Sequence, residues 1–188
     1  MQQSTLAHDR VTVWDLPTRL FHWMLVGSIL LAFLSSEEDS ALAAWHIPAG
    51  WVAAVLIVFR LMWGVVGGEH ARFASFIRSS HISKHVRGLF SGHAEPSLGH
   101  NPLGALAVIA MLGLIAAVIA TGVTMTGGEE LHEALAWGLL ALIGVHVAAV
   151  LLTSLVTRDN LVRAMITGSK KASRHPGARD ARGAGWYA

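Results

Sequence analysis

Five histidines lie inside or at the ends of long apolar segments of this sequence: His22, His46, His100, His132 and His146. Ionisable side chains are costly inside a bilayer, usually face the protein interior there, and indicate function by default. A neutral imidazole is a common axial ligand of haem iron. The first hypothesis is therefore that some of these histidines ligate haem.

The chain has 188 residues and no cysteine. This excludes disulfides, thiolate metal sites, iron–sulfur clusters and covalent haem attachment through Cys-x-x-Cys-His. Hydrophobic residues make up 53% of the chain and charged residues 14%, against about a quarter charged in soluble domains. This composition indicates a membrane protein. Because the chain has no cysteine, any haem in it would be b-type. The polar N-terminus lacks the features of a secretory signal, so we expect the first helix to be retained.

A membrane-spanning helix needs about 20 mostly apolar residues. Four segments qualify, at about 17–36, 46–67, 102–127 and 134–157. Short connections at two of the three joins predict that the first helix pairs with the second and the third with the fourth. The predicted fold class is all-α, an integral membrane four-helix up-down bundle over residues 1–168, followed by a basic, mobile cytoplasmic tail at 169–188. No internal repeat is evident.

The distribution of basic residues predicts the orientation, because loops rich in Lys and Arg stay in the cytoplasm. These residues precede the first helix, lie between the second and third, and follow the fourth. The other two loops contain no Lys or Arg and carry Glu37, Glu38, Asp39, Glu129, Glu130 and Glu133. Both termini are therefore predicted to be cytoplasmic. The pI near 9.5 then reflects topology and attraction to anionic membrane lipid, and no nucleic-acid partner is expected.

A haem with two axial histidines needs them from different helices at similar depth, on opposite faces of the porphyrin. His132 and His146 are fourteen residues apart on one helix, which is close to four turns, or about 21 Å. One helix can therefore serve two haems. Depth then pairs His46 with His132 near the outer side and His22 with His146 near the cytoplasm. The second match is looser, because His146 counts as deeper than His22 unless a helix tilts or the fourth helix extends further.

Glycines follow three of the histidines at helical spacing: Gly27, Gly50 and Gly104. A flat macrocycle needs close approach to the backbone, which glycine permits. Helix packing alone is the alternative explanation for these glycines.

Two further residues are candidates for cofactor binding. Arg60 lies fourteen residues after His46 and hence on the same face, where its guanidinium could bind a haem propionate or extend to lipid headgroups. His100, in GHNPLG at 99–104, could bind a propionate, line a quinone pocket or replace His22 as an inner ligand. A plain helix-capping role is the fourth alternative for His100.

Several segments together resemble the bacterial cytochrome b561 and nickel–iron hydrogenase b-type cytochrome family, from about Val11 to Lys171. The segments are VWDLPTRLFHW at 13–23, FRLMWGVVG at 59–67, HARFASF at 70–76, GHNPLG at 99–104, LHEALAWGLLALIGVHVAAVLL at 131–152 and NLVRAMITG at 160–168. The resemblance implies a cytochrome with two haem b groups in the bacterial inner membrane. It places the metal ligands at His22, His46, His132 and His146, in agreement with the depth argument.

The resemblance also implies transfer of electrons between the quinone pool and a periplasmic or membrane-bound redox partner. The chain would act as the membrane subunit of an oxidoreductase or as a stand-alone quinol oxidase. No acid–base or nucleophilic catalytic residues are needed for this role. The oligomeric state stays open, a homodimer included.

The alternative function is a small transporter or metal-ion carrier that uses intramembrane histidines without haem. A zinc ion would need three or four ligands within about 2 Å. Histidines four turns apart on one helix cannot provide these jointly, so the sequence favours the cytochrome.

Overall fold

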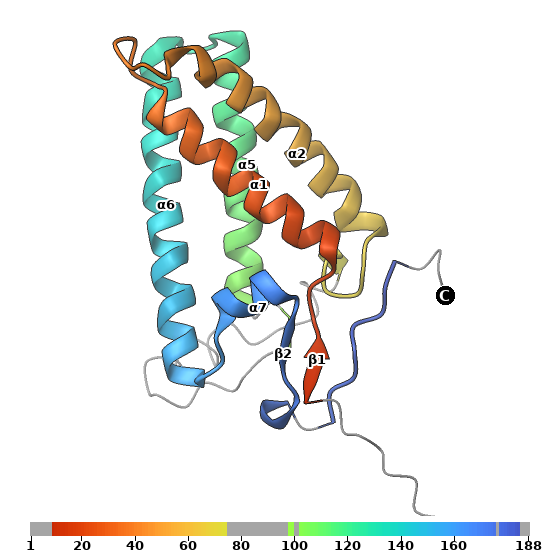
Figure 1. Cartoon of the computed structure of the whole chain (residues 1–188). Helices are drawn as coiled ribbons and strands as arrows, with labels where there is room; N and C mark the ends of the chain where they lie inside the picture. The colour runs from red at the N-terminus through yellow and green to blue at the C-terminus, as the bar shows by residue number, and fades with distance from the viewer. Residues whose placement is uncertain (1–8, 75–97, 100–101, 176, 185–188) are drawn as a thin grey trace, which may run out of the picture.

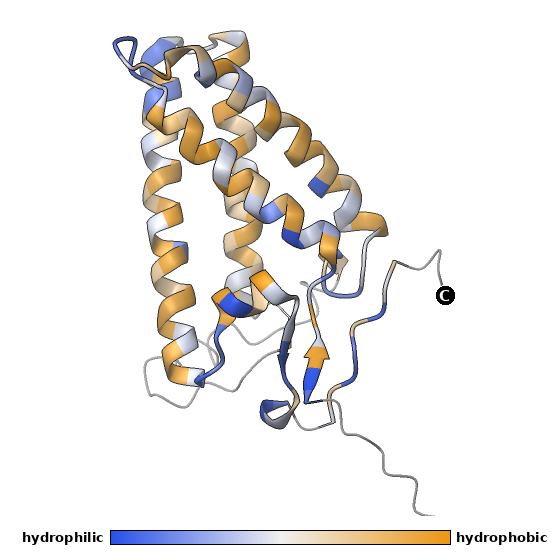
Figure 2. Cartoon of the chain, viewed as in Figure 1, coloured by the Kyte–Doolittle hydropathy of each residue, from blue (hydrophilic) through white to orange (hydrophobic). Residues whose placement is uncertain are grey.

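Four long helices form the body of the molecule (Figure 1). The structure is a computed structural model and describes residues 9–74, 98–99, 102–175 and 177–184. The helices are α1 (Leu16–Leu34), α2 (His46–Val66), α5 (Pro102–Thr124) and α6 (Gly128–Thr157). All four are long and apolar enough to cross a membrane, and apolar residues cover them along most of their length (Figure 2). The predicted all-α, four-helix membrane fold is confirmed.

The helix limits agree with the expected spans at most ends. The exception is α6, which begins six residues before the predicted residue 134. Gly127 and Gly128 have φ angles of +83° and +76°, a left-handed conformation that glycine adopts at little cost. The chain therefore reverses directly into α6. Glu129 and Glu130 then lie in the first turn of the helix, where negative charge suits the helix dipole.

The bundle consists of two helical hairpins, α1 with α2 and α5 with α6, joined mainly by contacts between α2 and α5. The short 3₁₀ helix η1 (Ala43–Trp45) leads into α2. A shared apolar core contains residues from all four long helices: Phe21, Leu25, Ala53, Leu56, Ile57, Leu112, Ile115 and Leu139. Helix association in lipid depends on such close packing, since the lipid itself is as apolar as these side chains.

Asp15 fixes the start of α1 and ties it to the end of α2. One carboxylate oxygen caps α1 by accepting a hydrogen bond from the Thr18 backbone N–H at 2.9 Å, as an N-cap aspartate does. The other oxygen accepts from the Trp63 indole N–H at 3.1 Å and from the Gly68 backbone N–H at 3.3 Å. The first hairpin is thus closed by one carboxylate at the end opposite its connecting loop.

A small cap, which the sequence did not predict, joins the two ends of the chain. Strand β1 (Arg10–Thr12) pairs antiparallel with β2 (Ser169–Lys171), and the short helix α7 (Leu161–Thr167) connects α6 to β2. Val13, Trp14 and Ala164 form a buried cluster beneath this cap. The pairing places the first and last described segments at the same end of the bundle (Figure 1).

The segment after residue 168, predicted as a mobile tail, is in contact with the rest of the protein over its described part. After β2 and the 3₁₀ helix η2 (Ala172–Arg174), Asp180 accepts a hydrogen bond from the Thr12 backbone N–H at 2.6 Å. The Arg182 backbone N–H donates to the Glu69 carboxylate at 3.1 Å, and the Glu69 N–H donates to the Arg182 carbonyl at 3.0 Å. The Arg182 N–H also holds the pKa of Glu69 below its usual range.

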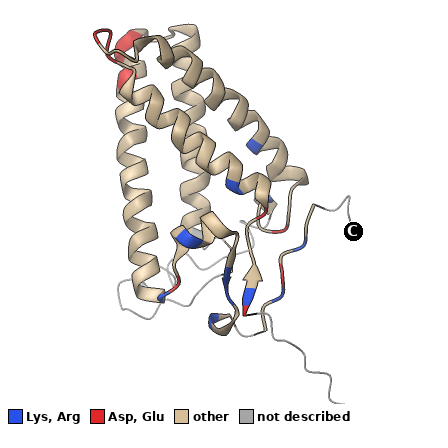
Figure 3. Ribbon diagram, in the orientation of Figure 1, with Lys and Arg blue, Asp and Glu red and all other residues tan. Residues whose placement is uncertain are grey.

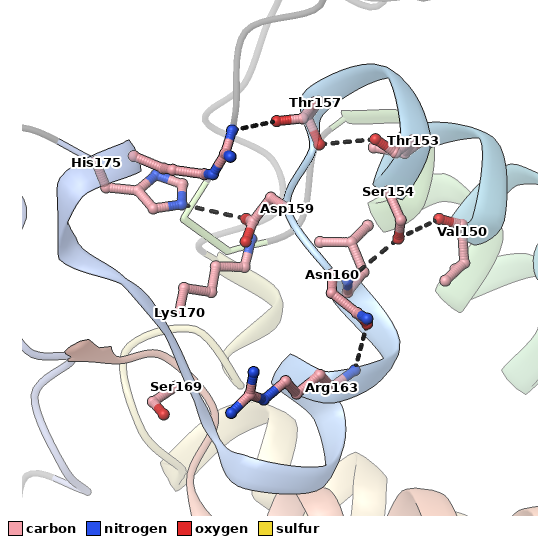
Figure 4. Close-up of polar contacts among 12 residues, drawn as sticks. Val150, Thr153, Ser154, Thr157, Asp159, Asn160, Arg163, Ser169, Lys170 and His175 are labelled. Atoms are coloured by element: carbon pink, nitrogen blue, oxygen red, sulfur yellow. Dashed lines mark hydrogen bonds and ion pairs between the residues drawn. The ribbon is translucent and has the colours of Figure 1, made fainter. Parts of the chain in front are cut away.

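A buried charged cluster joins the end of α6 to this segment (Figure 4). The Asp159 carboxylate lies 3.1 Å from the Lys170 ammonium and 3.2 Å from Nε2 of His175, and all three side chains are buried. Burial lowers the pKa of Lys170, while Asp159 opposes that shift. His175, a residue of the predicted mobile tail, is therefore buried in contact with Asp159. His8, His81, His85 and His93 lie outside the described residues.

Replacing Asp159 by Asn should reduce the free energy of unfolding by about 3–5 kcal/mol, because it leaves the buried Lys170 ammonium without its carboxylate. Denaturant titration of the detergent-solubilised protein measures this loss. Arg179→Met is the matched control, since Arg179 is 65% exposed and 3.7 Å from Glu69. Removing such a surface pair should cost no more than about 1 kcal/mol. Equal losses in the two variants would contradict the structural role of Asp159.

Candidate haem-binding histidines

His46 and His132 face each other at the end of the bundle where the two hairpins turn. His46 is the first residue of α2, and His132 lies just over one turn into α6. Their ring centres are 6.2 Å apart and their planes are inclined at 79°. The structure therefore brings together the two histidines that the depth argument pairs, one from each hairpin.

Each of these two rings is held by a backbone carbonyl of the neighbouring helix in its own hairpin. Nδ1 of His46 is 2.9 Å from the Ala32 carbonyl of α1, and Nδ1 of His132 is 3.1 Å from the Val118 carbonyl of α5. A carbonyl oxygen can only accept, so Nδ1 of each ring carries a proton, and in the neutral imidazole the lone pair is then on Nε2. Among the described residues, neither Nε2 atom makes a hydrogen bond.

This donor set fits a haem iron. Histidines that bind metals almost always donate their other N–H to a carbonyl or carboxylate, which fixes the ring and raises the basicity of the ligating nitrogen. An imidazole nitrogen lies about 2 Å from a bound metal, so two such bonds on opposite sides of one iron fit within the 6.2 Å between ring centres. The pair satisfies both requirements.

Gly122 and Thr121 of α5 also contact His132, and the sequence analysis missed both. A Cβ at Gly122 would lie 2.9 Å from Cε1 of His132, so only glycine leaves room for the ring. The Thr121 hydroxyl is 3.3 Å from Nδ1 of His132. Gly122 lies ten residues and Thr121 eleven residues before His132, and their contact with it could be predicted only with knowledge of how α5 and α6 are aligned.

His22 of α1 and His146 of α6 form the second predicted pair. Nδ1 of His22 is buried and has no hydrogen-bond partner among the described residues. A buried polar atom in this state calls for an explanation, and a bound ligand is one.

The helix α6 ends at Thr157, as predicted, eleven residues beyond His146. Its end reaches past the start of α1 (Figure 1).

Gly27 and Gly50 do not pack against any neighbouring helix among the described residues. A Cβ at either position would meet no described atom within 4 Å. The packing alternative therefore does not account for these two glycines, which leave space beside the helices that carry His22 and His46.

Arg60 is buried in α2, only 3% exposed, and it does not extend to the surface as a snorkelling side chain would. Its guanidinium lies 4.8 Å from the centre of the Phe73 ring. Phe73 rests on Gly64, where a Cβ would overlap the ring. The guanidinium is thus fixed in place by packing. His100 lies outside the described residues.

No group of three or more His, Asp or Glu side chains able to hold a metal ion occurs within the described ranges. These residues therefore provide no ligand set for the alternative of a metal-ion carrier. Pairs of histidines, in contrast, are what an axially ligated haem uses.

Comparison with known proteins gives matches over most of the chain. The family model described as prokaryotic cytochrome b561 matches residues 13–168. Similar curated proteins include the probable Ni/Fe-hydrogenase B-type cytochrome subunit of Bradyrhizobium diazoefficiens, 23% identical, with 90% of this chain and 89% of the relative covered. The protein of that name from Azotobacter vinelandii is 24% identical, with 89% and 91% covered. No solved structure matches.

The family match covers all four membrane-spanning helices and both candidate histidine pairs. It also confirms the resemblance noted in the sequence. The chain belongs to the prokaryotic cytochrome b561 family and is a multi-pass membrane b-type cytochrome that functions in electron transfer.

Proposed function

We propose that the protein binds two haem b groups, one between His46 and His132 and one between His22 and His146. The observation that carries this proposal is the first pair, in which each Nδ1 donates to a carbonyl and each Nε2 is left for a ligand. Haem b supplies a one-electron redox couple when bound. The protein orients the imidazoles, excludes water and sets the electrostatic surroundings.

Arg60 is proposed to bind a propionate of the inner haem, the one between His22 and His146. It is buried, fixed against Phe73 and lies fourteen residues, close to four turns, beyond His46 on α2. A guanidinium pairs well with a carboxylate in such surroundings. The role of His100, whether a propionate or quinone contact, an inner ligand in place of His22 or a helix cap, stays a prediction from the sequence.

The cap formed by β1, β2 and α7 is proposed to lie in the cytoplasm, with the bundle in the bacterial inner membrane. Lys and Arg gather at the end of the bundle that carries this cap, whereas the opposite loops hold acidic residues (Figure 3). Basic loops remain on the cytoplasmic side of the inner membrane. The His46–His132 pair would then lie near the periplasm.

Electrons are proposed to pass between the membrane quinone pool and an oxidoreductase that this chain serves as a membrane subunit. The relatives named as hydrogenase cytochrome subunits support a redox enzyme as the partner. Two haems on α6, about 21 Å apart along the helix by residue spacing, would connect the two sides of the membrane.

The ligand pairs can be tested by haem counts on purified variants. His46→Ala and His132→Ala should each lose the same haem, and His22→Ala and His146→Ala the other, because one axial ligand is removed in each case. A pyridine haemochrome assay gives the number, and redox titration identifies which haem is lost. Retention of both haems by His46→Ala and by His22→Ala would refute the assignment.

Gly122→Ala should reduce the content of the haem held by His132 by at least half, because the new methyl group would lie 2.9 Å from the ring. Gly113→Ala on the same helix is the control, since its methyl group meets nothing within 4 Å. Haem content per protein is measured for both. Loss of haem from the Gly113→Ala control, or full haem content in Gly122→Ala, would contradict the packing of the His132 ring against Gly122 of α5.

A quinol analogue should reduce the oxidised protein in detergent, as seen in the absorption bands of reduced haem b. Dithionite defines full reduction in the same sample. Reduction by dithionite with none by the quinol would exclude the quinone pool as the direct electron source.

A further inference from the structure

The two hairpins have the same arrangement of residues around their histidines, although the sequence shows no obvious repeat. Equivalent residues of the two hairpins are 86 positions apart in the chain. Four pairs of equivalent residues have this separation. They are the first residue of the first helix in each hairpin, the residue whose carbonyl binds the histidine, the residue with a buried hydroxyl, and the histidine itself. The pairs are Leu16 with Pro102, Ala32 with Val118, Ser35 with Thr121, and His46 with His132.

In the first hairpin the Ser35 hydroxyl and His46 share one carbonyl. Ser35 Oγ is 2.6 Å from the Leu31 carbonyl and 3.2 Å from the Ala32 carbonyl, and His46 Nδ1 is 2.9 Å from that same Ala32 oxygen. Ser35 is among the most deeply buried side chains, at 2% exposure. Ala32 lies in the last turn of α1, where carbonyls lack a partner within the helix.

The second hairpin repeats this arrangement with a threonine. Thr121 Oγ1 is 3.0 Å from the Ala117 carbonyl and 3.0 Å from the Val118 carbonyl, and His132 Nδ1 is 3.1 Å from the Val118 oxygen. Thr121 is also buried. Because its hydrogen points to these carbonyls, its oxygen can additionally accept from Nδ1 of His132, 3.3 Å away.

One difference between the hairpins has a clear cause. The helix α1 ends at Leu34, whereas α5 continues to Thr124, two residues beyond Gly122. The position that corresponds to Gly122 is Ser36, which lies after the end of α1 and is exposed. A side chain is tolerated there because the chain has left the helix, and glycine is needed where the helix continues beside the ring.

We propose that Ser35 and Thr121 are equivalent positioning residues that act on the outer haem through the carbonyls of Ala32 and Val118. This rests on the proposed ligand role of His46 and His132. Donation from Nδ1 to a carbonyl raises the basicity of the ligating nitrogen and favours ferric iron. A hydroxyl that donates to the same carbonyl competes for its lone pairs and weakens that donation. The two hydroxyls therefore hold the potential of the outer haem higher than the carbonyls alone would set it.

Redox titration of purified variants tests the proposal. Ser35→Ala should retain both haems and shift the midpoint potential of one of them to a more negative value, because His46 then donates more strongly. Thr121→Val should shift the same haem by less, since the loss of the oxygen that accepts from His132 opposes the change. Thr121→Ser, which keeps the hydroxyl, should restore the original potential.

Two matched controls keep the hydroxyl chemistry but lack a histidine on the carbonyl. Ser28 donates to the Leu25 carbonyl at 3.0 Å on α1, and Thr124 donates to the Ala120 carbonyl at 2.7 Å on α5. Ser28→Ala and Thr124→Val should leave both potentials unchanged. A Ser35→Ala protein whose potentials equal those of the Ser28→Ala protein, or in which both haems shift equally, overturns the proposal.

Failure of the ligand assignment is separable from failure of this proposal. If His46→Ala retains both haems, the assignment fails and the role of the hydroxyls fails with it. If His46→Ala loses one haem while Ser35→Ala leaves both potentials in place, only the hydroxyl proposal is wrong.

Discussion

The bond between an imidazole Nδ1 and a carbonyl of the adjacent helix is the interaction on which the arrangement of this bundle depends. A helix in lipid satisfies nearly all of its own backbone groups, so few are left to orient a polar side chain from a neighbour. In both hairpins a carbonyl fourteen residues before the histidine takes this role. Each hairpin therefore presents a histidine already oriented by its own two helices, and the space between the hairpins is where the two rings meet.

Sequence reasoning succeeded where a property is local. The apolar lengths gave the four helices to within a few residues at most ends, and depth alone paired His46 with His132, which the structure places 6.2 Å apart. It missed Gly122 and Thr121, because their contact with His132 depends on the alignment of two helices and leaves no trace in the local pattern. The equivalence of the two hairpins was not evident in the sequence either. Ser35 and Thr121 make equivalent hydrogen bonds, but they are different residue types and most of their neighbours differ as well.

The cap at the basic end follows a different principle from the bundle. Among the described residues of the four long helices, the one buried Lys, Arg, Asp or Glu is Arg60, whereas the cap buries the carboxylate of Asp159 with Lys170 and His175. A buried ion pair is costly to desolvate and adds little net stability over apolar packing, but its geometry is demanding. Lys170 and His175 read as ordinary basic residues of a solvated tail, and only the fold shows that they converge on one oxygen atom. The composition of the segment could not predict these contacts, because they depend on where β2 and η2 lie against the end of α6.

The pairing of β1 with β2 has a consequence for how the chain is made. Arg10 emerges from the ribosome near the beginning of translation, but its partner Lys171 is synthesised only after all four helices. Until then the first strand and the cap it belongs to have no partner, while α1 and α2 can already insert and pair through local contacts. The strand pair can thus form only after synthesis has passed all four long helices and reached β2. A chain truncated before residue 169 would hold its hairpins in the membrane with the N-terminal strand unpaired.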